Sequence, residues 1–304
     1  MIVSLKNMCK SINLYYVVIF YLLLFLLLVF IPQRKQKNFI EGNQILIIGG
    51  STGLGISLAI QLQDMGCKVY IAGRNLEKLK HLQKIHGFNF YVLDVRDINT
   101  LKVITEKFNY VFYCAGYCVP GYFIDLKIED FKQMMDTNFF GCINTLKYLL
   151  HANKTPFSYI AIASTVCYYT FPGYSGYSPS KAALKSFFDA AELELEKKNI
   201  KSYIYFVNTI DSLGFKNENK TKPEFTKYVE GEATEKSNPD IRASVLIKSL
   251  KDERTKIVKD FETQILKVAP SIDYFSEIIY LPLAIIILPV WNYYIRKLFL
   301  NHHQ

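Results

Sequence analysis

A tyrosine and a lysine four positions apart, Tyr177 and Lys181, have the residue types and the spacing needed for acid–base chemistry. On a helix that begins near Tyr177, positions i and i+4 share one face, so the Lys181 ammonium is expected beside the phenol. A nearby cation favours the phenolate, which predicts a Tyr177 pKa lowered toward the working pH. Such a phenol can protonate a carbonyl oxygen and recover the proton in the reverse reaction. Ser164, expected on a strand end opposite, could hydrogen-bond the same oxygen.

The Tyr-x-x-x-Lys spacing alone is weak evidence, because the chain contains 22 tyrosines, and a pair on an ordinary solvated helix explains it more simply. A glycine-rich turn upstream changes that balance. Gly49-x-x-x-Gly53-x-Gly55 stands between an apolar run at 44–49, typical of a buried parallel strand, and an apolar-periodic helix. Glycines there allow a pyrophosphate to approach closely, and the helix N-terminus offers it free N–H groups. The turn therefore predicts a dinucleotide site.

Two side chains at strand ends bear on which dinucleotide is bound. Arg74 follows a strand expected at 67–72, where an acidic residue would bind the ribose 2′-hydroxyl and an arginine suits a 2′-phosphate. NADPH is therefore expected rather than NADH, with a plain surface arginine as the alternative. Asp94 ends a strand expected at 88–93, where it would meet the adenine edge or cap the following helix.

Short apolar runs alternate with helical patterns along the central part of the chain, which predicts an α/β fold with a doubly wound parallel sheet, a Rossmann fold. The other strands are expected at 109–114, 157–163 and 201–207, and the other helices at 75–86, 97–107, 127–150 and 177–198. A polar, charged stretch at 214–240 is interpreted as a mobile lid. The expected domains are an anchor at 1–37, the Rossmann domain at 43–265 with its lid near 211–240, and a hydrophobic segment at 270–304.

Both ends of the chain carry apolar tracts. Residues 14–31 are an unbroken apolar run, long enough for a transmembrane helix. A cleaved signal peptide is the alternative, but no small-x-small cleavage site follows the run. The second tract, 278–295, contains Pro282 and Pro289, so a re-entrant or interfacial segment is as plausible as a span. Membrane association is expected at both ends, and flanking charges do not decide the orientation.

Composition and charge make nucleic-acid binding and a metal site less favoured than a membrane-associated protein that binds a dinucleotide. The chain has a net charge of +9, but its basic residues are interleaved with 27 acidic ones, so anionic membrane headgroups explain them better than nucleic acid does. Six cysteines without a CxxC pattern fit a reducing compartment. The five histidines lack ligand spacing apart from a terminal pair, and no metal is predicted.

Together the motifs resemble those of the short-chain dehydrogenase/reductase family over about residues 43–215. The matching pieces are GGSTGLG at 49–55, LDV at 93–95, CAG at 114–116, Asn138, Ser164, Tyr177 and Lys181. The resemblance implies that Tyr177 donates the proton and Ser164 positions the carbonyl. It also implies that Lys181 binds the nicotinamide ribose and that Asn138 holds a water in a proton relay. The cofactor contacts it implies are Gly49, Ser51, Thr52, Gly53, Leu54, Gly55, Arg74, Asp94, Val95, Ala115, Gly116, Tyr177, Lys181 and, in place of a customary threonine, Ser212.

A narrower resemblance lies downstream. DSLGF followed by ENKTKP, within 211–223, is similar to the DTPGF…ENxTKP stretch of 3-ketodihydrosphingosine reductases, which share the CAG motif and the apolar ends. This implies NADPH-dependent reduction of a long-chain keto-amine lipid at the cytosolic face of the endoplasmic reticulum membrane. Two departures stand out: Ile48 replaces a usual threonine, and 207–210 replaces a proline-rich segment near the nicotinamide.

Two rival functions stay open. The first is another membrane-bound reductase of the same family, acting on a steroid, retinoid or acyl-chain ketone. The second is a non-catalytic membrane scaffold, which would have no need of Ser164, Tyr177, Lys181 and Asn138 together. A homodimer formed through 127–150 and 177–198 is expected by analogy with the family.

Overall fold

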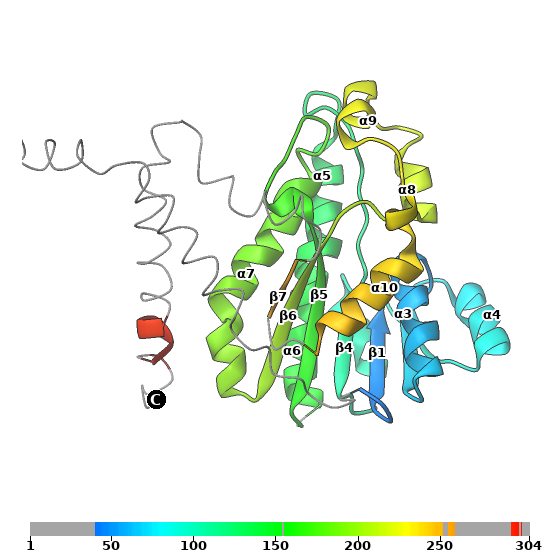
Figure 1. The fold of residues 1–304 in the computed structure, drawn as a ribbon, viewed down its shortest axis with the longest axis vertical. Helices are drawn as coiled ribbons and strands as arrows, with labels where there is room; N and C mark the ends of the chain where they lie inside the picture. Colours follow the sequence, from blue (N-terminus) through cyan, green and yellow to red (C-terminus); the bar gives the residue numbers. More distant parts are fainter. Residues whose placement is uncertain (1–39, 154, 252–254, 259–292, 298, 300–304) are drawn as a thin grey trace, which may run out of the picture. The chain divides into compact units, whose positions relative to one another are not determined.

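The computed structural model of the chain describes residues 40–153, 155–251, 255–258, 293–297 and 299. Its centre is a parallel sheet of seven strands in the order β3-β2-β1-β4-β5-β6-β7 (Figure 1). The strands are β1 Gln44–Ile48, β2 Lys68–Gly73, β3 Asn89–Val92, β4 Tyr110–Tyr113, β5 Phe157–Ser164, β6 Ile200–Val207 and β7 Lys256–Ile257. The order reverses between β1 and β4, which is where ligands bind in doubly wound sheets.

Helices connect the strands and cover both faces of the sheet (Figure 1). The α-helices are α3 Gly53–Asp64, α4 Leu76–His86, α5 Ile128–Met135, α6 Gly141–Ala152, α7 Tyr177–Lys197, α8 Leu213–Glu218, α9 Glu224–Glu230 and α10 Pro239–Ser249. The shorter turns are η1 Ile98–Val103, η2 Asp136–Phe140, η3 Thr165–Cys167 and η4 Glu235–Ser237.

Alternate side chains of each strand enter two separate hydrophobic clusters. On β1, Leu46 and Ile48 pack with residues of α6 and α7, whereas Ile45 and Ile47 pack with residues of α3, α4 and α10. All four are buried almost completely. Because successive strand side chains point to opposite faces, this arrangement requires apolar residues on both, and it explains the continuous apolar runs. The doubly wound prediction is confirmed.

Two predicted helices differ from the structure. The segment 97–107 forms only the 3₁₀ turn η1, because Ile98, Thr100 and Val103 are β-branched and disfavour an α-helix. The segment 127–150 is continuous but contains a π turn, η2, in which the Gly141 N–H donates to the carbonyl of Asp136 five residues before it. A π turn inside a helix often marks a functional site.

The predicted lid is a folded structure. Residues 214–240 contain α8, α9 and η4, and α10 begins at Pro239. The sequence prediction missed α10 because it follows a polar stretch, yet Ala243 and Leu246 of α10 are completely buried against the sheet face covered by α3. It also missed β7, a strand of two residues.

The membrane predictions fall mainly outside the described residues. The expected anchor at 1–37 lies wholly outside them, as does most of the C-terminal segment at 270–304. Within the described part of the chain, no helix has both the length and the hydropathy needed to cross a bilayer.

Candidate active site

A cavity of about 690 Å³ opens at the carboxyl ends of β4, β5 and β6. Its wall runs from the glycine turn before α3 to the start of α7 and on to the lid formed by α8 and α9. Its volume lies in the range of small-molecule and cofactor sites. The predicted residues that line it are Gly49, Thr52, Gly53, Leu54, Gly55, Gly116, Ser164, Tyr177, Lys181 and Ser212.

The glycine turn has no room for side chains at two key positions. Gly49 has φ +82°, and a Cβ there would lie 2.6 Å from the Ala115 nitrogen. A Cβ at Gly55 would lie 2.3 Å from the carbonyl oxygen of Gly49. Thr52, the N-cap of α3, makes no side-chain cap hydrogen bond, and the first turn holds no acidic residue. The helix end therefore presents N–H groups and a positive dipole to the cavity, which fits a pyrophosphate.

Tyr177 is the first residue of α7 and lines the cavity opposite the end of β5. Burial raises the pKa of Tyr177 well above its ordinary value, the electrostatic effects of nearby Cys118 and Glu218 add to the rise, and a hydrogen bond with Ser164 opposes it. The prediction that Lys181 lowers this pKa is therefore wrong for this structure. The phenol is neutral at neutral pH, which is the form that donates a proton.

Lys181 lies one turn along α7 but interacts mainly with the sheet. Its Nζ donates a 2.9 Å hydrogen bond to the carbonyl oxygen of Ile162, and it lies 5.9 Å from the centre of the Tyr177 ring. Lys181 is only 6% exposed, and this burial lowers the pKa of its ammonium. The i, i+4 spacing thus places the two groups on one face, as predicted, while β5 determines where the ammonium points.

Asn138 is completely buried in the π turn, and its side chain hydrogen-bonds the backbone of Tyr117 in the loop after β4. Its Oδ1 accepts from the Tyr117 N–H at 2.9 Å, and its Nδ2 donates to the Tyr117 carbonyl at 3.0 Å and to Ser180 Oγ at 2.9 Å. The side chain therefore has partners on every polar atom. The predicted role of Asn138 in a proton relay stays a prediction.

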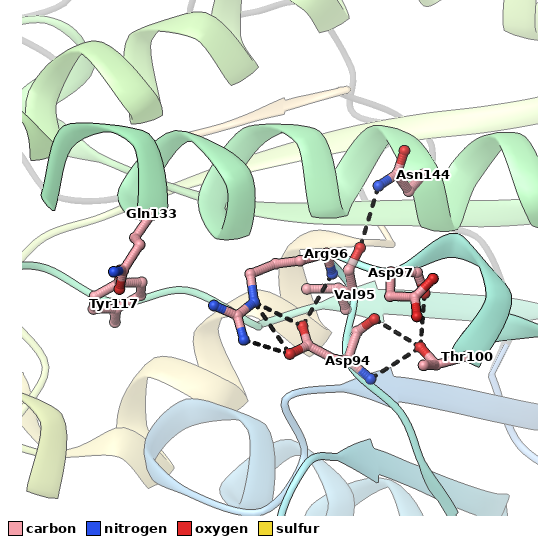
Figure 2. Close-up of polar contacts among 8 residues, drawn as sticks. All are labelled: Asp94, Val95, Arg96, Asp97, Thr100, Tyr117, Gln133 and Asn144. Atoms are coloured by element: carbon pink, nitrogen blue, oxygen red, sulfur yellow. Dashed lines mark hydrogen bonds and ion pairs between the residues drawn. The ribbon is translucent and has the colours of Figure 1, made fainter. Parts of the chain in front are cut away.

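The predicted 2′-phosphate corner lies beyond the cavity. Arg74 is exposed after β2, and Ser51 Oγ lies 3.6 Å from the position of a Cβ on Gly73. Asp94 is held by Arg96, which donates to the carboxylate from Nε at 3.0 Å and from Nη2 at 2.6 Å (Figure 2). This pairing is the main reason that the pKa of Asp94 is lowered, and the positive charge of Arg74 contributes a smaller part.

Asp94 is also not the cap of the next element. Asp97 caps η1, accepting from the Asn99 N–H at 2.9 Å, while Thr100 Oγ1 donates to the backbone carbonyl of Asp94 (Figure 2). The predicted residues that do not line the cavity are Ser51, Arg74, Asp94, Val95, Ala115 and Asn138.

Sequence reasoning missed several polar groups that line the cavity from the lid side, notably Glu218, Glu230 and Tyr174. Glu218 belongs to the ENKTKP stretch, so the sequence did mark the segment without showing that it faces the cavity. No group of three or more histidine, cysteine, aspartate or glutamate side chains in the described part of the chain could hold a metal ion. The five cysteines described there are free.

Comparison with known proteins agrees with this geometry. Residues 43–222 match the family model of the short chain dehydrogenases. A 3-ketodihydrosphingosine reductase from Aspergillus fumigatus is 30% identical over 236 residues, which cover 63% of this chain and just under two thirds of that protein, 64%. A second one, from Yarrowia lipolytica, is 30% identical and covers 85% of this chain and 77% of its own. A 3-dehydrosphinganine reductase from Danio rerio is 26% identical, covering 69% and 68%.

Solved structures support the fold. A short chain dehydrogenase from Burkholderia cenocepacia, in complex with NADP, superposes with a TM-score of 0.66 over 79% of this chain and 97% of its own, at 18% identity. A variant of actinorhodin polyketide ketoreductase with NADPH gives a TM-score of 0.59 over 68% and 89%, at 19% identity.

Proposed function

The chain belongs to the short-chain dehydrogenase family, and we propose that it reduces the long-chain amino ketone 3-ketodihydrosphingosine to dihydrosphingosine with NADPH. The observation that carries this proposal is the meeting of Ser164, Tyr177 and Lys181 on one cavity that begins at an uncapped glycine turn. Relatives named for this reaction align over most of the chain.

The chain's own residues would hold the cofactor in two places. The glycine turn and the N-terminus of α3 suit the pyrophosphate. Arg74, which follows Gly73 at the end of β2, suits the 2′-phosphate that distinguishes NADPH from NADH. NADPH bound there supplies the hydride. Lys181 lines this cavity and is largely buried, and in this proposal its ammonium donates to the ribose hydroxyls.

The proton comes from Tyr177. The neutral phenol donates it to the carbonyl oxygen of the ketone as charge builds on that oxygen. The Ser164 hydroxyl, at the end of β5, hydrogen-bonds both the phenol and the same oxygen and so orients the carbonyl. The cationic Lys181 lies close enough to stabilise the phenolate left behind.

The lipid character of the substrate is part of the proposal. Tyr169 and Val229 line the cavity and are 55% and 40% exposed. Tyr228, on the same helix α9 as Val229, is 86% exposed. Exposed apolar side chains around a site suit a lipid surface. We place the enzyme at the endoplasmic reticulum membrane, anchored through the apolar run at 14–31, with its catalytic domain in the NADPH-rich cytosol.

A substrate panel tests this function. The purified full chain in phospholipid nanodiscs is given NADPH with 3-ketodihydrosphingosine, a 3-ketosteroid, retinal or a simple long-chain ketone, and NADPH oxidation is followed by absorbance. We expect the highest kcat/KM for 3-ketodihydrosphingosine. A higher kcat/KM for the steroid or for retinal would assign the chain to a different reductase function. If no compound of the panel supports NADPH oxidation, a non-catalytic scaffold is favoured.

A further inference from the structure

The cavity contains a carboxylate that the proposed proton transfer does not use. Glu218 is the last residue of α8 and lines the same cavity as Ser164 and Tyr177. Its side chain is partly buried, and no group in the described part of the chain hydrogen-bonds or ion-pairs with it. The contacts of the described residues therefore assign no structural role to this carboxylate, which faces the cavity and is partly removed from water.

Its acidic neighbour, Glu230, is fully occupied. The Tyr174 hydroxyl donates to Glu230 Oε2 at 2.7 Å, and Thr209 Oγ1 donates to Oε1 at 3.3 Å. The Lys222 ammonium forms an ion pair with the same carboxylate, and its side chain is only 1% exposed. Lys222 Nζ also lies 4.4 Å from the centre of the Phe215 ring. The Lys222 ammonium is therefore bound to Glu230 and forms no ion pair with Glu218.

Three effects make the position of Glu218 unfavourable for an ionised carboxylate. Burial raises its pKa to about 7, and the negative charge of Glu230 contributes to the rise, while Lys222 and Lys181 oppose it only in part. Glu218 also ends a helix, where the carbonyl dipoles disfavour a negative charge. A cation bound in the cavity beside Glu218 would offset the unfavourable free energy of all three effects. Strongly perturbed groups that lack a structural role tend to mark functional sites.

Glu218 shares the cavity with the residues of the reacting centre. It is one of the groups whose charge raises the pKa of Tyr177, and Lys181 acts on Glu218 in turn. The substrate of the proposed function carries a primary amine on the carbon next to its carbonyl, and this amine is protonated near neutral pH. With the carbonyl oxygen at Tyr177 and Ser164, the ammonium lies within a few ångströms of that oxygen, inside the cavity whose wall includes Glu218.

We propose that Glu218 binds the ammonium group of a 2-amino ketone and thereby selects it over neutral ketones of the same chain length. This inference rests on the proposed function and adds to it the group that recognises the amine. The partner is a primary ammonium held by an otherwise unpaired carboxylate, an interaction between two charges that excludes uncharged analogues.

The test compares charged and neutral substrates on the full-length protein in nanodiscs. The ketones are 3-ketodihydrosphingosine, its N-acetylated form and the chain-matched 1-hydroxy-3-ketone without the amine. For the amino ketone, Glu218→Gln should raise KM about 10- to 100-fold, the loss of one charge-assisted contact, with a smaller change in kcat. For the two neutral ketones KM should stay within about twofold of wild type. Glu224→Gln, at an exposed glutamate of α9, is the matched control and should leave all three substrates unchanged.

The outcomes separate this inference from the function beneath it. If wild type prefers the amino ketone and Glu218→Gln loses that preference, both stand. If wild type reduces the amino ketone but Glu218→Gln keeps the full preference, the role of Glu218 is refuted while the proposed function survives. If wild type reduces none of the three, the function and the inference fall together. Thermal melting and NADPH titration of Glu218→Gln confirm that the variant is folded and binds the nucleotide.

Discussion

Replacing Glu218 by glutamine should make the protein more stable, although it weakens substrate binding. The pKa of this carboxyl rises from an ordinary value of 4.5 to about 7 on folding, mainly because folding removes it from water. Below pH 4.5 the group is protonated in both the folded and the unfolded chain, so it has no effect on stability. As pH rises from 4.5 to about 7, the unfolded chain ionises first, and the free energy of unfolding falls. Above pH 7 the loss is complete.

The size of the effect follows from the same two values. A pKa rise from 4.5 to about 7 corresponds to roughly 3 kcal/mol above pH 7, and the part of the carboxylate that keeps contact with water brings this toward about 2 kcal/mol. Glutamine has nearly the same shape and no charge, so Glu218→Gln should recover most of this free energy at pH 8 and almost none at pH 4. In a chain of this size, we expect Tm to rise by about 4–8 °C at pH 8.

Differential scanning calorimetry of the full chain at several pH values between 4 and 8 measures the gain. The control is Glu224→Gln, whose carboxylate is 88% exposed and whose surface ion pair with Lys227 contributes little. The Tm difference between Glu218→Gln and wild type should grow with pH, and that of the control should stay near zero. A Tm difference for Glu218→Gln that is independent of pH, or negative at pH 8, would refute the reasoning.

Three further changes test other parts of the site. Tyr177→Phe should lower kcat by at least about 100-fold, since it removes the proton donor, while NADPH binding measured by fluorescence stays close to wild type; nearly full activity would reject the mechanism. Arg74→Asp should raise KM for NADPH by about 10- to 100-fold through loss of a charged phosphate contact and change KM for NADH little, so equal losses for both would reject the phosphate role. Lys222→Met should lower the free energy of unfolding by about 3 kcal/mol because it leaves Glu230 without its cation, whereas Lys227→Met on the surface should change it by less than about 1 kcal/mol; similar chemical denaturation curves for the two variants would contradict the buried pair.

The strands, the glycine turn and the start of α7 were predicted well because each depends on residues that are close together in the sequence. The apolar runs give the strands, and Gly49 and Gly55 mark a turn that only glycine can form. The spacing of Tyr177 and Lys181 gave their shared helix face. In contrast, the pKa of Tyr177 depends on what surrounds the phenol in three dimensions, and Cys118 and Glu218 are distant from it in the sequence. The sequence prediction considered only the neighbouring lysine and reached the wrong direction.

Polar residues at the strand ends show the same limit. Asp94 was predicted from its position alone, but its partner is Arg96, two residues away, and this pairing decides its charge balance. The prediction of a helix at 97–107 was wrong for a similar reason. The spacing of its apolar residues suited a helix, but its β-branched residues and the cap by Asp97 favour a short 3₁₀ turn. Periodicity identifies which residues are buried more reliably than it identifies the geometry that buries them.

The lid shows why specificity is harder to infer than fold. Glu218 and Glu230 are two glutamates of one polar stretch, and although Glu218 lies in the ENKTKP motif, the sequence does not show which of the two carboxylates is left without a partner. The fold does, because it brings Tyr174, Thr209 and Lys222 to Glu230 and leaves Glu218 open to the cavity. Structures that share the sheet and helices at 18% identity keep the same framework with few residues in common, so the framework does not select the substrate. That selection must come from segments such as α8 and α9, where changing the Glu218 carboxylate to an amide should weaken recognition of an amine more than it changes the proton transfer from Tyr177.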